Sequence, residues 1–310
     1  MKVFVAGASG AVGRPLVRQL IAVGHEVTGM TRREDRAEEI RVAGAEAVVC
    51  DAFDAEGLRE SVVGAAPDAV VHALTAIPEP IDWKADPLAA TNRVRIEGTR
   101  NLIGAARAAD ARRIVAESVA FLYAPRGGRV KDEEAELFFE APDPFGPTVD
   151  ALADMEHQVR EAERIDGVVL RFGNFYGPGT SFAADGSQAK EARRRRLPVV
   201  GKGTGIFSFI HVEDAAAAIV AALESETVGT YNVVDDEPAP MSEWVPAYAE
   251  AIGAKPPRRV PVWLAGLIVG RGVARNAVEL RGASNAKAKR ELGWEPRNPS
   301  WRQGFREALG

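Results

Sequence analysis

Three glycines near the start of the chain have the spacing of an anion-binding loop. Residues 3–6 form a short apolar run, and GASGAVG at 7–13 leads from it into an amphipathic segment. Gly7 permits a tight turn, Gly10 lets the backbone approach a phosphate, and Gly13 allows a helix to pack closely on the strand. The start of that helix would offer free N–H groups to a pyrophosphate. The sequence therefore predicts a dinucleotide-binding loop.

The residues after the second predicted strand bear on which dinucleotide is bound. An NAD site usually has Asp or Glu there, because a carboxylate accepts hydrogen bonds from the ribose hydroxyls. Here Thr31 is followed by Arg32 and Arg33, and a guanidinium binds phosphate oxygens through two parallel hydrogen bonds. We therefore expect NADP, with NAD as the alternative. The competing interpretation is ordinary surface charge, balanced by Glu34 and Asp35.

The elements that must position these residues follow an alternating pattern. Short apolar runs alternate with amphipathic helical segments, which is typical of a parallel sheet covered on both faces. We therefore expect an α/β fold with a Rossmann-type, doubly wound parallel sheet. The predicted strands lie at 3–6, 26–30, 47–50, 69–73, 113–117 and 168–172. The predicted helices lie at 14–23, 36–43, 55–65, 87–109 and 149–165.

The character of the sequence changes after the sixth predicted strand, where Gly and Pro become frequent and indicate loops. We expect a dinucleotide-binding Rossmann domain at 1–173 and a smaller, mainly substrate-binding lobe at 174–310. Residues 206–224 are expected to pack back on the sheet through a helix at 213–224. A further short helix is predicted at 286–292.

Composition narrows the functional classes. The 310 residues include 39 basic and 44 acidic residues, for a net charge of -5, so we expect no nucleic-acid partner. Cys50 is the single cysteine, which favours a reducing compartment. Met1 leads directly into a strand, leaving no room for a signal peptide, and the apolar stretch at 260–270 is shorter than the roughly 20 residues that span a bilayer. We expect a cytoplasmic protein with a small-molecule substrate, no membrane partner and no metal.

Ordered matches along the chain resemble the extended short-chain dehydrogenase/reductase group, the NAD-dependent epimerase/dehydratase family. The resemblance covers nearly the whole chain and implies a Rossmann fold, a nicotinamide dinucleotide cofactor and a homodimer formed through the helices at 87–109 and 149–165. Besides the glycine loop, the matching stretches are VVHA at 70–73, TN at 91–92, GTRNL at 98–102, VLRFGNFYGPG at 169–179, FIHVED at 209–214, YNV at 231–233 and KAKRELGWEP at 287–296.

The resemblance also implies which residues hold the cofactor. Asp51, at the end of the third predicted strand, is placed to accept a hydrogen bond from the adenine amino group. The full expected set is Gly7, Ser9, Gly10, Ala11, Val12, Gly13, Arg32, Arg33, Asp51, Ala52, Ala73, Leu74, Thr75, Asn92 and Phe172.

The proton-transfer pair of the family is missing from this chain. The resemblance implies a Ser or Thr after the fifth strand and a Tyr followed four residues later by Lys, whose charge lowers the Tyr pKa from about 10. The chain has four tyrosines, and none has Lys at that spacing. One alignment puts Phe145 and Val149 in the two positions, and another puts Thr148 and Leu152 there. Either way, both groups that exchange protons are lost.

Two residues remain as candidates for catalysis. Ser118 matches the family Ser to within one position and would polarise a substrate carbonyl. Tyr123 follows it at the carboxyl edge of the sheet, where open α/β sheets bind their ligands, and either Tyr123 or water would supply the proton. The competing interpretation of Tyr123 is packing at a strand end. Tyr176, which follows the sixth predicted strand, is a comparable candidate for the proton donor. His211 has a family position that implies a structural hydrogen bond instead.

The predicted substrate pocket is apolar. Family members that act on nucleotide sugars carry an Arg just before the FIHVED stretch to hold the diphosphate, but Phe207 stands there. An apolar ring cannot pair with a diphosphate, so we expect a smaller or more apolar substrate. For each aromatic residue, core packing is the competing interpretation. The candidate pocket residues are Trp83, Phe145, Asn174, Phe175, Tyr176 and Phe207, with Trp263 as a further wall.

Together these features predict an NAD(P)-dependent oxidoreductase acting on a small carbonyl or hydroxyl substrate that is not a nucleotide sugar, by an atypical proton transfer. Two alternatives remain. A catalytically inactive dinucleotide-binding sensor would explain the loss of both proton-transfer groups. A non-redox isomerase or lyase would use the same pocket. The complete substrate lobe favours the oxidoreductase.

Overall fold

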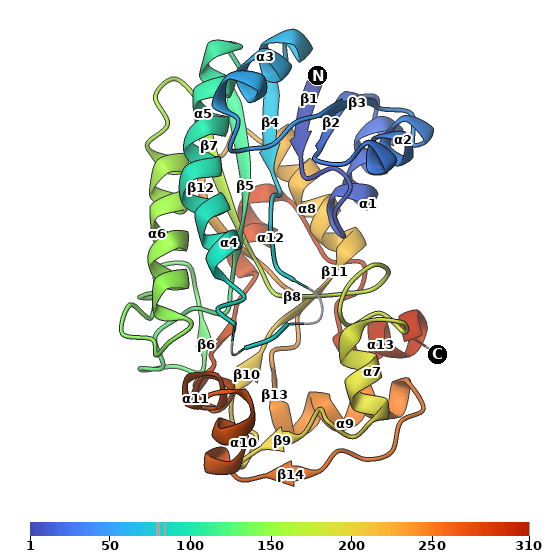
Figure 1. Ribbon diagram of the computed structural model, residues 1–310, viewed down its shortest axis with the longest axis vertical. Helices are drawn as coiled ribbons and strands as arrows, with labels where there is room; N and C mark the ends of the chain where they lie inside the picture. Colours follow the sequence, from blue (N-terminus) through green and yellow to red (C-terminus); the bar gives the residue numbers. More distant parts are fainter. Residues whose placement is uncertain (79–80, 84, 310) are drawn as a thin grey trace.

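Seven parallel strands form the central sheet of the computed structural model, which describes residues 1–78, 81–83 and 85–309 (Figure 1). Their order is β12-β7-β5-β4-β1-β2-β3. The order reverses direction between β1 and β4, as in doubly wound dinucleotide-binding folds, so the predicted fold class is confirmed. The strands are β1 (Lys2–Ala6), β2 (Glu26–Thr31), β3 (Glu46–Val49), β4 (Ala69–His72), β5 (Arg113–Val119), β7 (Asp166–Phe172) and β12 (Gly229–Val233).

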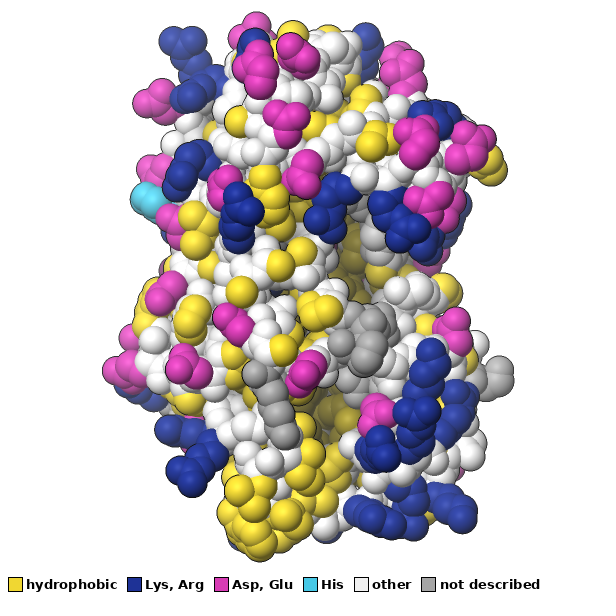
Figure 2. Space-filling model, in the orientation of Figure 1, with side chains coloured by type: hydrophobic (Ala, Val, Ile, Leu, Met, Phe, Trp, Pro, Cys, Tyr) yellow, Lys and Arg dark blue, Asp and Glu magenta, His cyan; other side chains and the backbone are white. Residues whose placement is uncertain are grey.

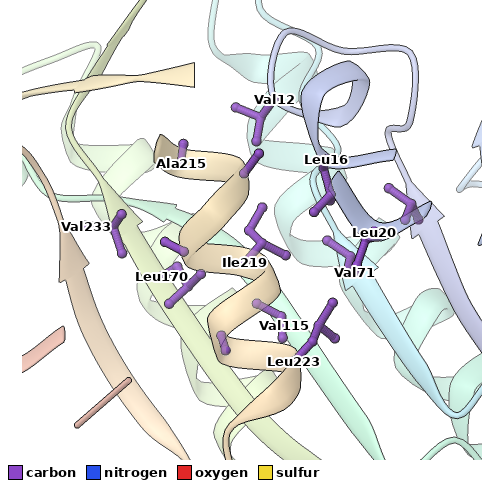
Figure 3. Close-up of a cluster of buried hydrophobic side chains, with 14 of the residues drawn as sticks. Val12, Leu16, Leu20, Val71, Val115, Leu170, Ala215, Ile219, Leu223 and Val233 are labelled. Atoms are coloured by element: carbon purple, nitrogen blue, oxygen red, sulfur yellow. The ribbon is translucent and has the colours of Figure 1, made fainter. Parts of the chain in front are cut away.

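Helices cover both faces of this sheet. On one face α1 (Gly13–Ala22) and α8 (Val212–Glu224) bury their apolar sides in a shared core. Figure 3 shows Leu16 and Leu20 of α1 meeting Ile219 and Leu223 of α8 above the strand residues. Each such fully buried side chain contributes about 1.5–3 kcal/mol. The other face is covered by α3 (Ala55–Ala65), α5 (Thr99–Ala108) and α6 (Gly146–Arg160).

The helix before α5 changes its winding beside the carboxyl edge of the sheet. The predicted helix at 87–109 is α4 (Ala89–Arg93), a π-helical turn η1 (Val94–Gly98) and then α5. Turns of this kind are concentrated at functional sites, because they displace side chains from the regular helical positions.

A second cluster of elements lies below the sheet in Figure 1. Its core is a set of aromatic rings contributed by segments far apart in sequence. Four short strand pairs bind it together, β8–β11, β10–β13, β9–β14 and β6–β15. The strands are β6 (Val130–Lys131), β8 (Asn174–Tyr176), β9 (Val199–Val200), β10 (Ile206–Phe207), β11 (Phe209–His211), β13 (Ala239–Pro240), β14 (Arg259–Val260) and β15 (Gly282–Ala283). The helices are α7 (Ser187–Arg193), α9 (Met241–Ala251), α10 (Val262–Val269), α11 (Arg271–Glu279) and α13 (Trp301–Leu309). Helix α12 (Ala286–Leu292) instead packs against β12 of the main sheet and against α8.

Several elements differ from the predicted ones. Strand β12 was not predicted, and it adds a seventh strand from beyond residue 174 to the main sheet. Helix α6 begins at Gly146 and ends at Arg160, so the predicted 149–165 was wrong at both ends. Helices α7, α9, α10, α11 and α13 were also not predicted. The domain boundary at 173/174 and the homodimer stay predictions. Within the described ranges, no helix is long and apolar enough to cross a bilayer.

Candidate functional site

The glycine loop is pressed between the end of β4 and the start of α1. Gly7 has a φ of 99°, a conformation that L side chains rarely adopt. A Cβ on Gly7 would lie 2.2 Å from the carbonyl oxygen of Ala73, and one on Gly13 would lie 2.1 Å from the carbonyl oxygen of Gly7. The first turn of α1 holds no acidic residue, so its positive dipole end is not neutralised there. This cradle fits a dinucleotide pyrophosphate.

The two arginines after β2 have different environments. The guanidinium of Arg33 forks onto Asp35, with Nε donating to Oδ1 at 2.9 Å and Nη2 to Oδ2 at 2.5 Å. Arg32 is exposed and forms no ion pair or hydrogen bond within the described part of the chain. The hydroxyls of Ser9 and Thr31 lie 3.2 Å apart, which joins the glycine loop to β2. Arg32 is therefore the arginine left free for a phosphate.

The ends of β3 and β4 complete the same edge of the sheet. The carboxylate of Asp51 accepts a hydrogen bond from the Phe53 N–H at 2.9 Å. The carbonyl oxygen of Ala52 accepts one from Asn101 at 2.9 Å. The Leu74 N–H points at Nδ1 of His72 at 3.3 Å, and burial lowers the pKa of His72 to about 4. His72 is therefore a neutral structural residue at this edge.

The remaining predicted cofactor residues divide into two groups. Ala11, Val12, Ala73 and Thr75 lie in the loops at the carboxyl ends of β1 and β4, beside the glycines. Phe172 is fully buried, with its ring 5.4 Å from that of Phe175. The structure thus gathers the loop residues at one edge and places Phe172 in the core.

Ser118 belongs to a buried ionic network. Its hydroxyl donates to Oε1 of Glu156 on α6 at 2.7 Å. Arg171 of β7 holds the same carboxylate through Nε at 2.8 Å and Nη2 at 2.6 Å. Ser118 is 1 % exposed, and the ion-paired side chains are buried too. The hydroxyl is therefore occupied in joining β5, α6 and β7.

Tyr123 closes the other end of this network. Its hydroxyl donates to Oδ1 of Asn232 at 2.6 Å and accepts from Nη1 of Arg171 at 3.0 Å. Burial raises the pKa of Tyr123, which makes it a poor proton donor at neutral pH. Tyr176 is fully buried among aromatic rings, and burial raises its pKa as well. His211 caps α8 by accepting from the Glu213 N–H at 3.3 Å.

An apolar cluster contains both positions of the first alignment, Phe145 and Val149, and the Leu152 of the second alignment, whose other position is Thr148. Phe145 and Val149 lie one helical turn apart at the start of α6 and pack together with Leu88, Leu122, Leu152 and Met155. Trp83 joins them, with its ring 5.7 Å from that of Phe145. Val119, the last residue of β5, packs against the same cluster. We call this group the apolar cluster; none of its members exchanges protons.

Glu117 is the ionisable group that the sequence reasoning missed. Along the end of β5, Ser118 is buried, whereas Glu117 and Val119 are partly exposed on the opposite face. Glu117 and Val119 lie two residues apart, so their Cα atoms are about 7 Å apart. Burial raises the pKa of Glu117 to about 7, and the positive charge of Arg95 opposes that rise. The signal in the sequence was a carboxylate that directly follows the apolar run IVA at 114–116 of a central strand.

Arg95 projects from the π-helical turn into this region. Its side chain is buried, and burial lowers its pKa to about 10. Nη1 donates to Oδ1 of Asn92 at 3.2 Å, and Nδ2 of Asn92 donates to the hydroxyl of Thr148 on α6 at 3.2 Å. Asn92, predicted to bind the cofactor, thus holds Arg95 in place. The described residues contain no cluster of His, Cys, Asp and Glu that would hold a metal ion.

The predicted substrate-pocket residues do not form one wall. Trp83 and Phe145 meet in the apolar cluster. Phe207 packs instead against Trp244 of α9, with ring centroids 5.0 Å apart and the ring planes tilted by 55°. Asn174 donates to the carbonyl oxygen of Ser208 at 3.0 Å, and Phe175 packs against Phe172. Trp263 is 69 % exposed on α10, away from any aromatic wall.

Comparisons with known proteins agree with this architecture. The model of the NAD dependent epimerase/dehydratase family matches residues 3–234. The chain is 47% identical over 307 residues to a 3-diazoavenalumate denitrifying reductase of Streptomyces sp, covering 98% of this chain and 99% of that protein. It is 28% identical to a 2-alkyl-3-oxoalkanoate reductase of Stenotrophomonas maltophilia, covering 82% and 76% of the two chains.

A solved structure shares the fold over the full length. The UDP-glucose 4-epimerase of Thermus thermophilus, in complex with NAD, superposes with a TM-score of 0.77 at 25% identity, covering 100% of this chain and 98% of that one. The glycine cradle, the doubly wound sheet and the family match agree. The chain is an enzyme-family member in which the proton-transfer pair has been replaced, and it belongs to the NAD-dependent epimerase/dehydratase family.

Proposed function

We propose that this protein is a nicotinamide-dependent reductase that replaces the diazo group of a carboxylate substrate with hydrogen and releases N2. The observation that carries the proposal is the apolar cluster, which fills the positions where a proton donor is expected. The relative that is 47% identical over nearly the whole chain is named for denitrifying reduction of a diazo-substituted carboxylate. A reaction in which no proton is transferred to carbon fits a site where apolar side chains replace the Tyr and Lys of the family.

The chemistry of a diazonium carbon explains this fit. When bound, the nicotinamide cofactor supplies a hydride. The hydride electron pair forms the new C–H bond, while N2 leaves with the electron pair of the broken C–N bond. Carbon is reduced, the cofactor is oxidised, and no proton enters the product at that carbon. Phe145, Val149 and Val119 then serve to exclude water, which would otherwise compete for the reactive carbon.

Glu117 is proposed as the counter-ion of the positively charged diazo group. It lies on the same face of β5 as Val119, at the margin of the apolar cluster. The cation of Arg95 favours its ionised form. Opposite charges attract more strongly where apolar side chains exclude water, because the local dielectric constant is lower. Above the pKa of about 7 the carboxylate is charged and able to hold the substrate.

We propose NADP as the cofactor, with NAD as the alternative. The glycine cradle would hold the pyrophosphate, and the free guanidinium of Arg32 would bind the 2′-phosphate. Arg33 is less suited, since Asp35 already holds its Nε and Nη2 in a two-pronged ion pair. Titration of the protein with NADPH and NADH tests this assignment.

A second candidate is the small carbonyl reduction that the sequence predicted. Glu117 favours it as well, because a carboxyl group with a pKa of about 7 is able to donate a proton to an alkoxide. The two candidates differ in the sign of their pH dependence. Diazo reduction requires ionised Glu117 and weakens as the pH falls below 7. Carbonyl reduction requires protonated Glu117 and weakens as the pH rises above 7.

The decisive experiment follows the origin of the new hydrogen atom. The protein is incubated with a carboxylate-bearing arenediazonium ion and NADPH deuterated at the transferred position, and the product is examined by mass spectrometry. We expect N2 release and one deuterium on the arene, with enzyme-dependent oxidation of NADPH. Heat-denatured protein controls for direct reduction. If a panel of ketones is reduced and the diazonium ion is not, the second candidate is correct; if neither is turned over, the sensor interpretation returns.

A further inference from the structure

Helix α10 presents an unbroken set of large apolar side chains to solvent. Val262, Trp263, Leu264, Leu267 and Ile268 are 38, 69, 37, 65 and 61 % exposed, respectively. Figure 2 shows this apolar knob at the lower end of the molecule. Exposed apolar patches of this kind mark interaction sites, because their contact with water is unfavourable.

Basic residues flank helix α10 along the sequence. Between residues 255 and 281 the chain carries six basic residues and one acidic residue, Glu279, for a local net charge of +5 in a chain whose overall charge is -5. Arg275 pairs with Glu279 at 3.0 Å. Within the described part of the chain, the other basic residues form no ion pair. The basic residues are Lys255, Arg258, Arg259, Arg271, Arg275 and Arg281, which we call the basic collar.

We propose that α10 inserts into the interfacial region of a membrane that carries anionic lipids. Apolar side chains that enter the headgroup and acyl boundary, with cations at its rim, are the features of interfacial membrane-binding helices. Trp263 is suited to this boundary, because its ring is apolar and its N–H finds polar partners. A helix of eight residues is about 12 Å long, so it lies at the surface and does not span. The sequence predicted no membrane partner because the apolar stretch at 260–270 is too short to span a bilayer. That argument does not apply to a helix that lies at the membrane surface.

A second copy of the chain fits this surface less well. A symmetric contact through α10 would place the same patch on both sides and bring two basic collars together. Like charges across an interface are unfavourable. A membrane with anionic lipids complements both parts of the surface. Its headgroups attract the basic collar, and the apolar layer directly beneath them accepts the apolar knob.

The proposed membrane surface is connected to the apolar cluster. Gly270 joins α10 to α11, and Val273 of α11 packs against the cluster that contains Phe145. Gly272 lies so close to Asp143 that an added Cβ would be 1.9 Å from the Asp143 carbonyl oxygen. The proposed membrane surface therefore lies one helix away from the candidate site. This inference does not depend on the diazo chemistry.

The test measures binding of the full chain to vesicles of phosphatidylcholine, with and without phosphatidylglycerol, by co-sedimentation. We expect at least ~10-fold stronger partitioning onto the anionic vesicles, falling as salt is raised. The emission of Trp263 should shift to the blue and resist acrylamide quenching on those vesicles. Trp244, Trp294 and Trp301 are buried, so they contribute little to the change.

Matched variants separate the two parts of the surface. Trp263→Ser with Leu267→Ser should lower partitioning ~10-fold or more, because both apolar anchors are lost; Val42→Ser, 79 % exposed on α2 (Glu34–Val42), should leave it unchanged. Arg259→Glu should weaken binding only to anionic vesicles, and Arg100→Glu on α5 is its control. Absence of binding, or equal binding to both vesicle types, overturns the proposal. So does a concentration-dependent dimer that Trp263→Ser abolishes in sedimentation velocity, since that outcome assigns the surface to a second copy.

Discussion

Replacing Ser118 with Ala distinguishes a structural hydroxyl from a catalytic one. The change removes a single hydrogen bond to the Glu156 carboxylate. A hydrogen bond to a charged group contributes about 1.5–3 kcal/mol. Here the value should lie near the lower end, about 1.5–2 kcal/mol, because Arg171 still donates to both carboxylate oxygens. For a chain of this size, each kcal/mol lowers Tm by about 2 °C, so we expect a decrease of about 3–4 °C.

The assay pairs thermal unfolding with steady-state kinetics on the same protein preparation. We expect kcat/KM to change by no more than about twofold at a temperature well below Tm, since a hydroxyl held by Glu156 does not contact substrate. Glu156→Ala is the companion variant. It should cost about 3–5 kcal/mol, because it leaves the buried guanidinium of Arg171 without its partner. A loss of kcat/KM of a hundredfold or more in Ser118→Ala, with an unchanged Tm, would refute the structural assignment and restore Ser118 as a catalytic residue.

Three further predictions concern the cofactor loop and the candidate site. In the unmodified protein, kcat/KM for diazo reduction should fall about tenfold per pH unit below 7, because protonation of Glu117 removes the counter-charge. Glu117→Gln should abolish this pH dependence of kcat/KM. Arg32→Ala should raise the Kd of NADPH by about tenfold and leave the Kd of NADH unchanged, as measured by fluorescence titration. Arg33→Ala should change neither Kd by more than about threefold. Equal effects of the two substitutions on the Kd of NADPH would contradict the assignment of Arg32 to the 2′-phosphate. Gly13→Ala should abolish cofactor binding or folding, because its Cβ would lie 2.1 Å from a carbonyl oxygen, while Gly104→Ala, with open space around it, should stabilise α5 by about 0.5–1 kcal/mol in denaturant unfolding.

The cofactor half of the fold was predictable because local chemistry determines it. The six predicted strands correspond to strands of the sheet, since buried parallel strands are near-continuous apolar runs. Gly7 and Gly13 signal a turn in which no side chain fits. Strand β12 carries no comparable signal. It has only five residues and includes the polar Asn232, whose hydrogen-bond partners Tyr123 and Glu133 lie about a hundred residues away in the sequence.

The candidate site was predictable in what it lacks but not in what it holds. The absence of a Tyr/Lys pair follows from counting spacings, whichever alignment is used. The orientation of Ser118 does not, because a shift of one residue along β5 changes the face of the sheet on which a side chain lies. That single position separates the buried Ser118 from Glu117 and Val119 on the opposite face. Arg95 was equally hidden, since its direction depends on the π-helical turn that displaces it.

The late position of β12 in the chain has a consequence for synthesis. Strand β7 ends at Phe172, but its neighbour β12 is complete only at Val233. At about 5–20 residues per second, the ribosome needs roughly 3–12 s to make the intervening segment. During that interval β7 has an unpaired edge, which is a template for association with other chains. During the same interval the Tyr123 hydroxyl, which accepts from Arg171, lacks its acceptor Asn232. The nascent chain, rather than the finished protein, is therefore the species most exposed to aggregation and most dependent on chaperones.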